Sequence, residues 1–297
     1  MNELRPSNFA NLIGQDKLVN SLNISVLSAN KRNDSLNHCL FSGPAGLGKT
    51  TLSNALANEL GSDIQVANGA NLRSIKNVIP YLMRVNNRSV LFIDEIHRMT
   101  KLVEEFLYPV MEDFKIDMSD GEEVISVQIP KFTLVGATTE AGVLSAPLRD
   151  RFKLKFTLEL YDELSLATLI ESNSKKLKIE MSDDAVFSLA KASRGTPRIA
   201  NGLLEWVRDY RIAKGLKVIT QSDLVASLSM RGINTDGSTE QDRKYLNFLK
   251  TQKNPVGLDT IVSSINVNKD TVLNVIEPFL LQSGKILKTS KGRMSND

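Results

Sequence analysis

One glycine-rich run holds the residues with the clearest chemical potential. Residues 43–50 read GPAGLGKT, which matches the pattern of a glycine, four residues, a second glycine, a lysine and a hydroxyl residue. In such a loop, backbone N–H groups and Lys49 surround nucleotide phosphates, and Thr50 reaches a magnesium ion. The flanks favour this interpretation over an ordinary glycine-rich turn, because 38–42 has the pattern of a buried strand and 51–60 that of a helix. The sequence therefore predicts binding of a nucleoside triphosphate.

A second run supplies carboxylates. Residues 90–95 read VLFIDE, an apolar stretch that ends in two acids and predicts a buried parallel strand. The carboxyl ends of such strands form the ligand-binding edge of an open α/β sheet. There Asp94 would hold Mg²⁺ opposite Thr50, and Glu95 would polarise the water that attacks the γ-phosphate. Acids that merely end a strand are the alternative, but beside the upstream loop the pair predicts hydrolysis.

Two later polar clusters extend the pattern. The apolar stretch 132–137 ends in Thr138 and Thr139, whose hydroxyls are candidates to sense the γ-phosphate, although such a pair alone is weak evidence. The LRDRF run that follows contains Arg149 and Arg151 just before a further strand. An arginine there either reaches the nucleotide of a neighbouring subunit or pairs with an acid of its own chain. The spacing leaves both interpretations open.

The composition is that of an ordinary globular protein, with 297 residues, 41% hydrophobic and 24% charged. No run of about 18 apolar residues occurs and the start of the chain is polar, so we expect a cytosolic protein that is neither membrane-inserted nor secreted. The only cysteine, Cys39, cannot form an internal disulfide and is expected in the core. Together with His38 and His97 it offers no zinc-site spacing. The net charge of +3 is too small to identify a polyanionic partner.

The chain divides into three predicted domains: a nucleotide-binding core at 1–161, a second domain at 162–232 and a third at 233–297. In the second domain apolar residues recur at three- and four-residue steps, which predicts a small helical lid. Its helices are expected at 164–174, at 182–193 with Ser182 as N-cap, and at 197–214 with Pro197 in the first turn. The turn-rich GINTDG run at 232–237 marks the boundary to the third domain.

The third domain has the pattern of a winged helix. Helices expected at 239–251, 258–266 and 269–281 precede a hairpin at 284–293. The last segment, 285–297, contains four basic residues and one acid. A tip of this kind suits contact with DNA phosphates without base reading, although a short basic run is also typical of a solvated tail.

An insertion at 115–128 interrupts the core and reads as a β-hairpin, because Asp120 and Gly121 form a turn signal between apolar residues. Val124, Ile125 and Val127 lie near its tip. They either contact a protein partner or pack inward.

Longer motifs carry a resemblance that spans nearly the whole chain. They are LFIDEIHR at 91–98, LYPVMEDF at 107–114, LSAPLRDRF at 144–152 and SRGTPRIAN at 193–201. With these motifs the chain resembles the RuvB family of AAA+ motors, which drive branch migration of Holliday junctions in bacteria. The resemblance implies an α/β fold: an AAA+ P-loop core with a parallel sheet, a small helical lid domain and a C-terminal winged-helix domain.

The resemblance also implies an activity and partners. It implies an ATP-dependent DNA translocase of homologous recombination, DNA repair and the SOS response, which uses ATP and Mg²⁺, releases ADP and works as a homohexameric ring on double-stranded DNA. The implied protein partners are RuvA, engaged through the hairpin 115–128, and RuvC.

Residue roles transfer position by position. Thr138 or Thr139 matches the first sensor, Arg198 the second sensor, and Arg149 or Arg151 the arginine finger. The positions implied to lie beside the nucleotide are Leu4, Arg5, Gly46, Lys49, Thr50, Thr51, Glu112, Asp113, Phe114, Arg151, Tyr161 and Arg198.

The sequence departs from the family pattern at several positions. Ala45 stands where proline is usual, and Glu140 where arginine is frequent. The implied DNA-contacting positions are Lys288 and Arg293, but Lys288 and Ser290 replace residues of an Arg-Thr-Pro-Arg-Gly-Arg run. Lysine lacks the planar fork of arginine, so the geometry of DNA contact is in doubt.

Two other functions compete with this interpretation. A clamp-loader-type AAA+ ATPase subunit shares the core and the lid but usually ends in a helical collar, whereas this chain has the pattern of a winged helix. A winged-helix regulator that uses ATP only as a switch is opposed by Asp94, Glu95 and the paired arginines.

Overall fold

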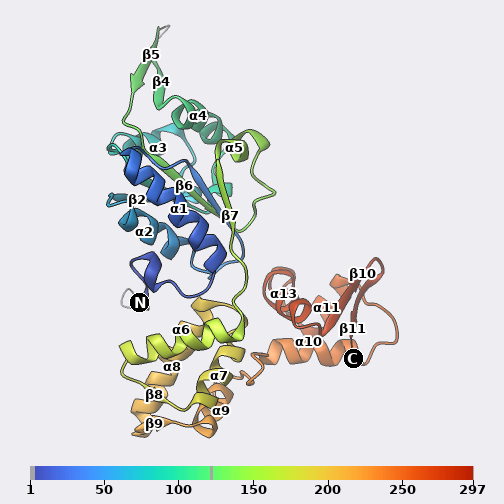
Figure 1. The fold of residues 1–297 in the computed structure, drawn as a ribbon. Coiled ribbons are helices and arrows are strands. Elements are labelled where there is room, and N and C mark those ends of the chain that lie inside the picture. The colour runs from blue at the N-terminus through green and yellow to red at the C-terminus, as the bar shows by residue number, and fades with distance from the viewer. Residues whose placement is uncertain (1–3, 121–122, 297) are drawn as a thin grey trace. The chain divides into compact units, whose positions relative to one another are not determined.

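The computed structural model describes residues 4–120 and 123–296, without the side chains of 118–120, 123 and 124. The chain forms two compact units, Met1–Ser165 and Leu166–Asp297. Figure 1 shows the elements of each unit. In the part of the chain that the structure describes, no helix is both long and apolar enough to cross a membrane.

The first unit is built on a five-stranded sheet whose paired strands all run parallel, in the order β2-β3-β6-β1-β7. The strands are β1 (Cys39–Ser42), β2 (Ile64–Asn68), β3 (Val90–Asp94), β6 (Thr133–Thr138) and β7 (Leu154–Thr157). The sequences VLFID and TLVGAT form the two strands next to each other in the middle, where both faces are buried. The strands predicted around the glycine-rich loop, the paired acids and the two threonines are thereby confirmed.

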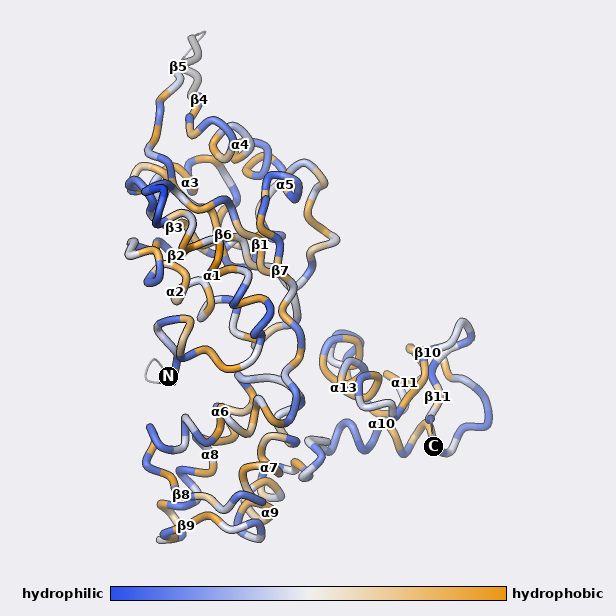
Figure 2. Tube along the Cα trace, in the orientation of Figure 1, coloured by the Kyte–Doolittle hydropathy of each residue, from blue (hydrophilic) through white to orange (hydrophobic). Residues whose placement is uncertain are grey.

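Alternate residues of β3 pack into two separate cores. Leu91 and Ile93 join a cluster with α3 (Ile75–Leu82), α4 (Lys101–Glu112) and α5 (Ala146–Arg151). Val90 and Phe92 join a second cluster with α1 (Asp16–Arg32) and α2 (Lys49–Glu59). Because side chains of a strand alternate between its faces, the sheet lies between two helical layers. Figure 2 shows hydrophobic residues along the central strands and a mixture of hydrophobic and hydrophilic residues along the helices.

The predicted hairpin is present as β4 (Lys115–Asp120) and β5 (Glu123–Gln128), an antiparallel pair that extends away from the sheet in Figure 1. At its base Ile116 is buried, whereas Ile125 is exposed and Val127 is half-buried. The side chain of Val124 lies outside the described residues. The three short 3-10 helices of this unit are η2 (Phe9–Asn11), η3 (Gly69–Asn71) and η4 (Ile96–Arg98), counted within the described ranges.

The second unit begins with a lid whose main helices follow the predicted ranges. They are α6 (Glu163–Lys176), α7 (Asp183–Ala192) and α8 (Pro197–Lys214), and they are followed by α9 (Gln221–Ser229), which was not predicted. Ser182 caps α7 by accepting the Ala185 N–H, and Pro197 opens α8, as predicted. The lid is not wholly helical, however: β8 (Glu180–Met181) and β9 (Val218–Ile219) form a short parallel pair, since both segments lead into helices that lie side by side.

The winged helix consists of α10 (Glu240–Lys250), α11 (Leu258–Ile265), α12 (Lys269–Thr271), η5 (Val272–Ile276), α13 (Glu277–Gln282), β10 (Ile286–Thr289) and β11 (Gly292–Ser295). The helices enclose a core around Tyr245, Ile261 and Leu280. The third predicted helix is not regular, because η5 is a π-helical segment. Pro278 lies just beyond it and has no N–H to donate to the preceding turn, which favours such an interruption.

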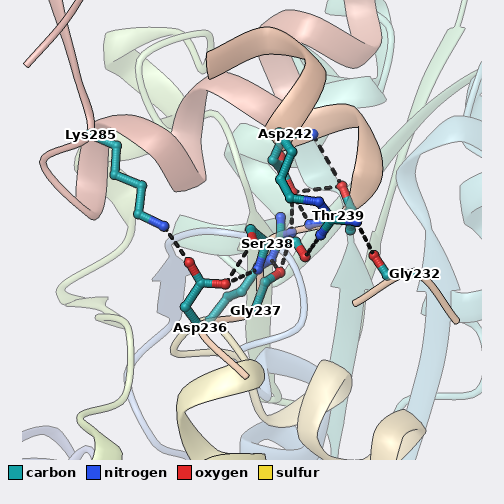
Figure 3. A network of polar contacts seen from close by, with 9 residues as sticks. Gly232, Asp236, Gly237, Ser238, Thr239, Asp242 and Lys285 are labelled. Atoms are coloured by element: carbon teal, nitrogen blue, oxygen red, sulfur yellow. Dashed lines mark hydrogen bonds and ion pairs between the residues drawn. The ribbon is translucent and has the colours of Figure 1, made fainter. Parts of the chain in front are cut away.

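Polar contacts join the lid to the winged helix within this unit (Figure 3). Arg194, which follows α7, pairs with Asp242 of α10 and donates to the carbonyl of Gly237. Its guanidinium lies 3.9 Å from the ring centre of Phe279. In the same network the ammonium of Lys285 pairs with Asp236.

Candidate nucleotide-binding site

The glycine-rich run forms a loop between β1 and α2. Gly43, Gly46 and Gly48 have φ values of 133°, 82° and 100°, a region that favours glycine. An added Cβ at Gly43 would also lie 2.5 Å from the carbonyl oxygen of Leu158. The helix that follows has no side-chain cap, so its first N–H groups face the loop. The loop thus has the backbone of a phosphate-binding site.

Lys49 lies over this loop. Its Nζ donates to the carbonyl oxygens of Gly43 at 2.7 Å and Pro44 at 2.9 Å, and the residue is buried. Thr50 and Thr51 follow it in the first turn of α2 and are half-buried. An ammonium and a helix N-terminus at one loop form a strongly electropositive site for phosphate oxygens.

The candidate catalytic acids lie at the carboxyl edge of the same sheet. Asp94 ends β3, and its Oδ1 accepts the N–H of Glu95 at 3.1 Å. Glu95 Oε2 accepts the hydroxyl of Thr139 at 3.3 Å. Because β6 lies between β3 and β1 and ends at Thr138, this threonine lies between the acids and the phosphate loop. The structure therefore brings the predicted lysine, acids and threonines to one edge.

His97 also belongs to this edge, although no role was predicted for it. Its Nδ1 lies 3.3 Å from Glu95 Oε2 and 2.9 Å from Thr138 Oγ1. Its Nε2 lies 3.8 Å from a carboxylate oxygen of Glu140. The only sequence signal was its position two residues after Glu95.

The donor set suits magnesium. Within residues 4–120 and 123–296 no three histidine, cysteine, aspartate or glutamate side chains gather into a metal cage. Mg²⁺ does not need one, because it keeps several waters and is held by one or two oxygen side chains together with substrate phosphates. The hydroxyl of Thr50 and the carboxylate of Asp94 are oxygen ligands of that kind.

A cavity of about 450 Å³ lies at the end of the first unit and is lined by Gly14, Gln15, Thr157 and Tyr161, among others. Tyr161 packs so closely on Gly14 that an added Cβ would lie 2.6 Å from its ring. Burial, and next the charge of Asp16, raises the pKa of Tyr161 to about 12. Leu4 is buried and Arg5 is exposed near the start of the described chain.

Arg151 takes part in a second cluster, on α4 and α5. Its guanidinium pairs with Glu112 at 3.1 Å, donates to the carbonyl of Pro147 at 2.8 Å and stacks 4.1 Å from the ring centre of Tyr108. Asp150 instead pairs with Lys155. Among the described residues, the half-buried Arg149 has no ion-pair partner. Arg151 thus forms the ion pair that was one of the two predicted interpretations, and which arginine reaches a neighbouring nucleotide stays a prediction.

Asp113 and Phe114 follow Glu112 at the end of α4. Asp113 is exposed, whereas Phe114 is half-buried against His38 and Phe132, with ring centres 6.0 Å apart in both pairs. Of the predicted nucleotide neighbours in this stretch, Glu112 and Asp113 therefore present polar groups at the surface.

Comparison with known proteins places all three parts of the chain. Residues 4–158 match the Holliday junction DNA helicase RuvB P-loop domain, 161–234 the RuvB AAA lid domain and 235–297 the RuvB C-terminal winged helix domain. The chain belongs to the RuvB family. Because the match includes the winged helix, the clamp-loader alternative is not favoured.

Relatives of the RuvB family align over almost the full chain. The "Holliday junction branch migration complex subunit RuvB" of Rhodopirellula baltica is 44% identical over 98% of this chain and 81% of its own length. The protein of the same name from Campylobacter jejuni strain RM1221 is 42% identical over 99% of this chain and 89% of its own. The solved Thermotoga maritima RuvB Holliday junction branch migration motor has a TM-score of 0.87 and 38% identity, over 99% of this chain and 95% of its own.

The remaining RuvB-type candidates lie in the second unit. Arg198 is exposed in the first turn of α8. On the wing, Lys288 has a side chain that is 52% exposed, but Arg293 is only 12% exposed. Arg293 forms two hydrogen bonds, of 2.7 and 3.2 Å, to the buried Glu277, and this carboxylate raises the pKa of Arg293. The structure thus exposes Lys288 and engages Arg293 inside the domain.

Proposed function

We propose that this chain is the ATP-driven motor of Holliday-junction branch migration in recombination and repair. The observation that carries the proposal is a phosphate loop and two carboxylates at one sheet edge in a chain that matches RuvB relatives over a P-loop domain, a lid and a winged helix. The relatives named for branch migration of Holliday junctions support the substrate.

The proposed reaction is hydrolysis of the terminal phosphate of ATP. The loop N–H groups and Lys49 bind the phosphates, and Thr50 and Asp94 would hold Mg²⁺, which would supply positive charge to the phosphates. Glu95 orients the attacking water and accepts its proton as the water oxygen bonds to phosphorus and the bond to the ADP oxygen breaks. Thr138 or Thr139 contacts the γ-phosphate.

The finer assignments complete the site. Leu4, Arg5 and Tyr161 flank the nucleotide, with Gly46 and Thr51 at its phosphates, and Arg198 of the lid acts as the second sensor. In a hexameric ring the arginine finger and the Glu112 to Phe114 stretch contact the nucleotide of the next subunit. Lys288 contacts duplex DNA directly, and Arg293 contributes to this contact by holding β11 through Glu277. The hairpin 115–128 engages RuvA, RuvC joins the complex, and the protein works in the cytoplasm.

The deciding experiment is dissociation of a synthetic four-way junction by the purified chain with ATP, in the presence and absence of RuvA. We expect dissociation by the unsubstituted chain, strengthened by RuvA. Lys49→Ala removes a charge at the phosphates and is expected to lower the rate about 100-fold or more. Junctions that remain intact under all conditions, in a preparation that still hydrolyses ATP, contradict the proposed substrate.

The proposed assembly into a ring predicts how ATP hydrolysis depends on protein concentration. If each site is completed by a neighbouring subunit, ATP hydrolysis per subunit rises with protein concentration and with added DNA. A rate unchanged by dilution, by DNA and by substitution of either arginine argues against a shared site. Glu95→Gln is expected to lower hydrolysis about 10²- to 10⁴-fold. Comparison of this variant with the unsubstituted chain distinguishes a hydrolysing motor from a protein that uses ATP only as a switch.

A further inference from the structure

Glu95, the candidate general base, has a strained backbone. Its φ of 48° and ψ of 49° lie in the left-handed region, which is strained for a residue that carries a side chain. Such a conformation persists only where the surroundings fix it. Here the surroundings include η3, which follows β2 and packs against η4, the 3-10 helix that Glu95 caps.

Gly69 opens η3 at the point of closest approach to Glu95. A Cβ on Gly69 would lie 2.3 Å from the carbonyl oxygen of Glu95 and 3.0 Å from its carbonyl carbon. Both neighbours are backbone atoms in a close-packed interior, so neither can rotate away. Asn68 holds η3 in this place, because its side chain accepts the Ala70 N–H at 2.9 Å and its backbone pairs in register with Asp94.

His97 holds the carboxylate of the same residue. Its imidazole is 11% exposed, and its Nδ1 faces both Glu95 Oε2, at 3.3 Å, and Thr138 Oγ1, at 2.9 Å. Thr138 Oγ1 also accepts the N–H of Glu140 at 2.9 Å, which fixes the hydroxyl. His97 thus ties the candidate base to the end of β6, where the candidate sensor residues lie.

We propose that Gly69 and His97 are positioning residues for Glu95, Gly69 for its backbone and His97 for its carboxylate. The inference rests on the proposed ATP hydrolysis. A base that orients water must keep hydrogen-bond reach to it, and a displacement of about 1 Å costs about 10²-fold in rate. Both residues act on Glu95 and not on the phosphate loop, so their loss lowers turnover and leaves nucleotide affinity in place.

The backbone half of the proposal is tested with Gly69→Ala against Gly142→Ala, since a Cβ added at Gly142 meets nothing within 4 Å. We expect kcat for ATP to fall about 10²-fold in Gly69→Ala, with the affinity for a fluorescent ATP analogue within about twofold of the unsubstituted chain. Gly142→Ala should match the unsubstituted chain in both. Normal turnover by Gly69→Ala overturns this half, as does a joint loss of affinity and turnover, which reports a disrupted core.

The role of the His97 side chain is tested with two substitutions that introduce an amide. His97→Asn places an amide donor near the Nδ1 position, whereas His97→Gln places it near Nε2, toward Glu140. A hydrogen bond to a charged group contributes about 1.5–3 kcal/mol, so we expect His97→Gln and His97→Ala to lose about 10-fold or more in kcat, and His97→Asn to recover most of it. Equal turnover of Asn and Gln variants overturns the role of His97.

The parallel variant Glu95→Gln keeps the two proposals apart. If the unsubstituted chain binds ATP without hydrolysing it, the proposed function fails and this inference fails with it. If Glu95→Gln is inactive while Gly69→Ala and His97→Ala turn over normally, only the positioning inference fails.

Discussion

Arg149 and Arg151 lie two positions apart but have different surroundings, and this difference predicts which one is the arginine finger. Arg151 is held in one orientation by the ring of Tyr108 and the carboxylate of Glu112, whereas Arg149 has no ion-pair partner among the described residues. A group that is already oriented loses less entropy when it meets a phosphate. We therefore expect Arg151 to act on the neighbouring nucleotide.

Conservative substitution tests this expectation. Lysine keeps the charge but neither forms a planar fork nor stacks as a guanidinium does, so Arg151→Lys should lower hydrolysis by about 10²-fold or more, less than the ~10³- to 10⁵-fold contribution of a full finger because the charge is kept. Arg149→Lys is the matched control and should stay within about threefold. Mixing Arg151→Lys with Lys49→Ala should restore part of the activity at shared sites. The opposite ranking of the two variants assigns the finger to Arg149.

At the residue scale, the sequence predicts groups within one motif and misses those that depend on distant contacts. Lys49, Asp94 and Glu95 followed from spacing, because their chemistry is local to a loop or a strand end. Gly69 matters only through its approach to the Glu95 carbonyl. Tyr108 matters only because α4 packs on α5. No pattern within a single segment contains those facts.

Among the elements, α4 and β6 are joined by His38, a buried histidine just before β1 that must stay neutral. His38 Nδ1 accepts the N–H of Leu134 at 2.8 Å, and Nε2 lies 2.9 Å from the carbonyl oxygen of Met111, to which it donates. Burial, as the largest cause, lowers the pKa of His38 from its ordinary value, and the charge of Lys153 adds to this, while the hydrogen bond to Met111 opposes it. A protonated Nδ1 would have no lone pair for Leu134.

The sign of the pH dependence follows from this shift. The folded pKa of His38 lies below its unfolded value of about 6.5, so its stabilising contribution is complete above that pH and is lost as the pH falls below it. We expect the free energy of unfolding in urea to fall less steeply from pH 7 to pH 5 in His38→Gln than in the unsubstituted chain. His97→Gln serves as the histidine control. Identical pH slopes for His38→Gln and the unsubstituted chain would show that His38 does not titrate on unfolding.

Two of the basic residues of the wing have separable roles, because Lys288 lies 3.8 Å from Glu277 with a side chain that is 52% exposed, whereas the Arg293 side chain is 12% exposed and bonds Glu277 at 2.7 Å. Arg293 anchors β11 to Glu277, which is 2% exposed and also accepts the Tyr245 hydroxyl at 3.0 Å. Removal of one partner from a buried pair costs about 3–5 kcal/mol, so Arg293→Ala should destabilise the winged helix strongly. Lys288→Ala should leave stability nearly unchanged, weaken DNA binding and lower the salt slope of log K by about 1. Chemical denaturation and DNA titrations at several salt concentrations measure both. Equal stability of the two variants contradicts the anchoring role.

Elements with a strong period were predictable, and irregular ones were not. The ranges of α7 and α8 followed from apolar spacing and from Ser182 and Pro197 at their starts. The two-residue strands β8 and β9 are too short to have a period, and they exist because the segments before α7 and α9 meet. The π-helical segment η5 interrupts the third predicted helix, and this interruption depends on Pro278 and on packing in the core of the winged helix.

For the whole molecule, hydrolysis in the core must be coupled to the domain that contacts DNA, and the contacts of Arg194 are a candidate for this coupling. Arg194 is paired with Asp242 of the winged helix, and the two side chains are 12% and 1% exposed. Arg198, the candidate second sensor, lies four residues further on in the same segment. We therefore expect a movement of this segment with nucleotide state to be passed to the domain that carries the wing.

Arg194→Ala should break this connection while leaving the chemistry in place. The substitution leaves Asp242 buried with the Thr239 donors but without a counter-charge, at a cost of about 3–5 kcal/mol, so the winged helix loses its fixed position on the lid. We expect ATP hydrolysis within about threefold of the unsubstituted chain and junction dissociation at least about tenfold slower per ATP consumed. Arg208→Ala in α8 is the control, because Arg208 forms only a surface pair with the adjacent Asp209, worth about 0–1 kcal/mol. If hydrolysis and dissociation fall in proportion in Arg194→Ala, the Arg194–Asp242 pair only supports folding. If both rates stay at the level of the unsubstituted chain, force reaches the DNA by another route.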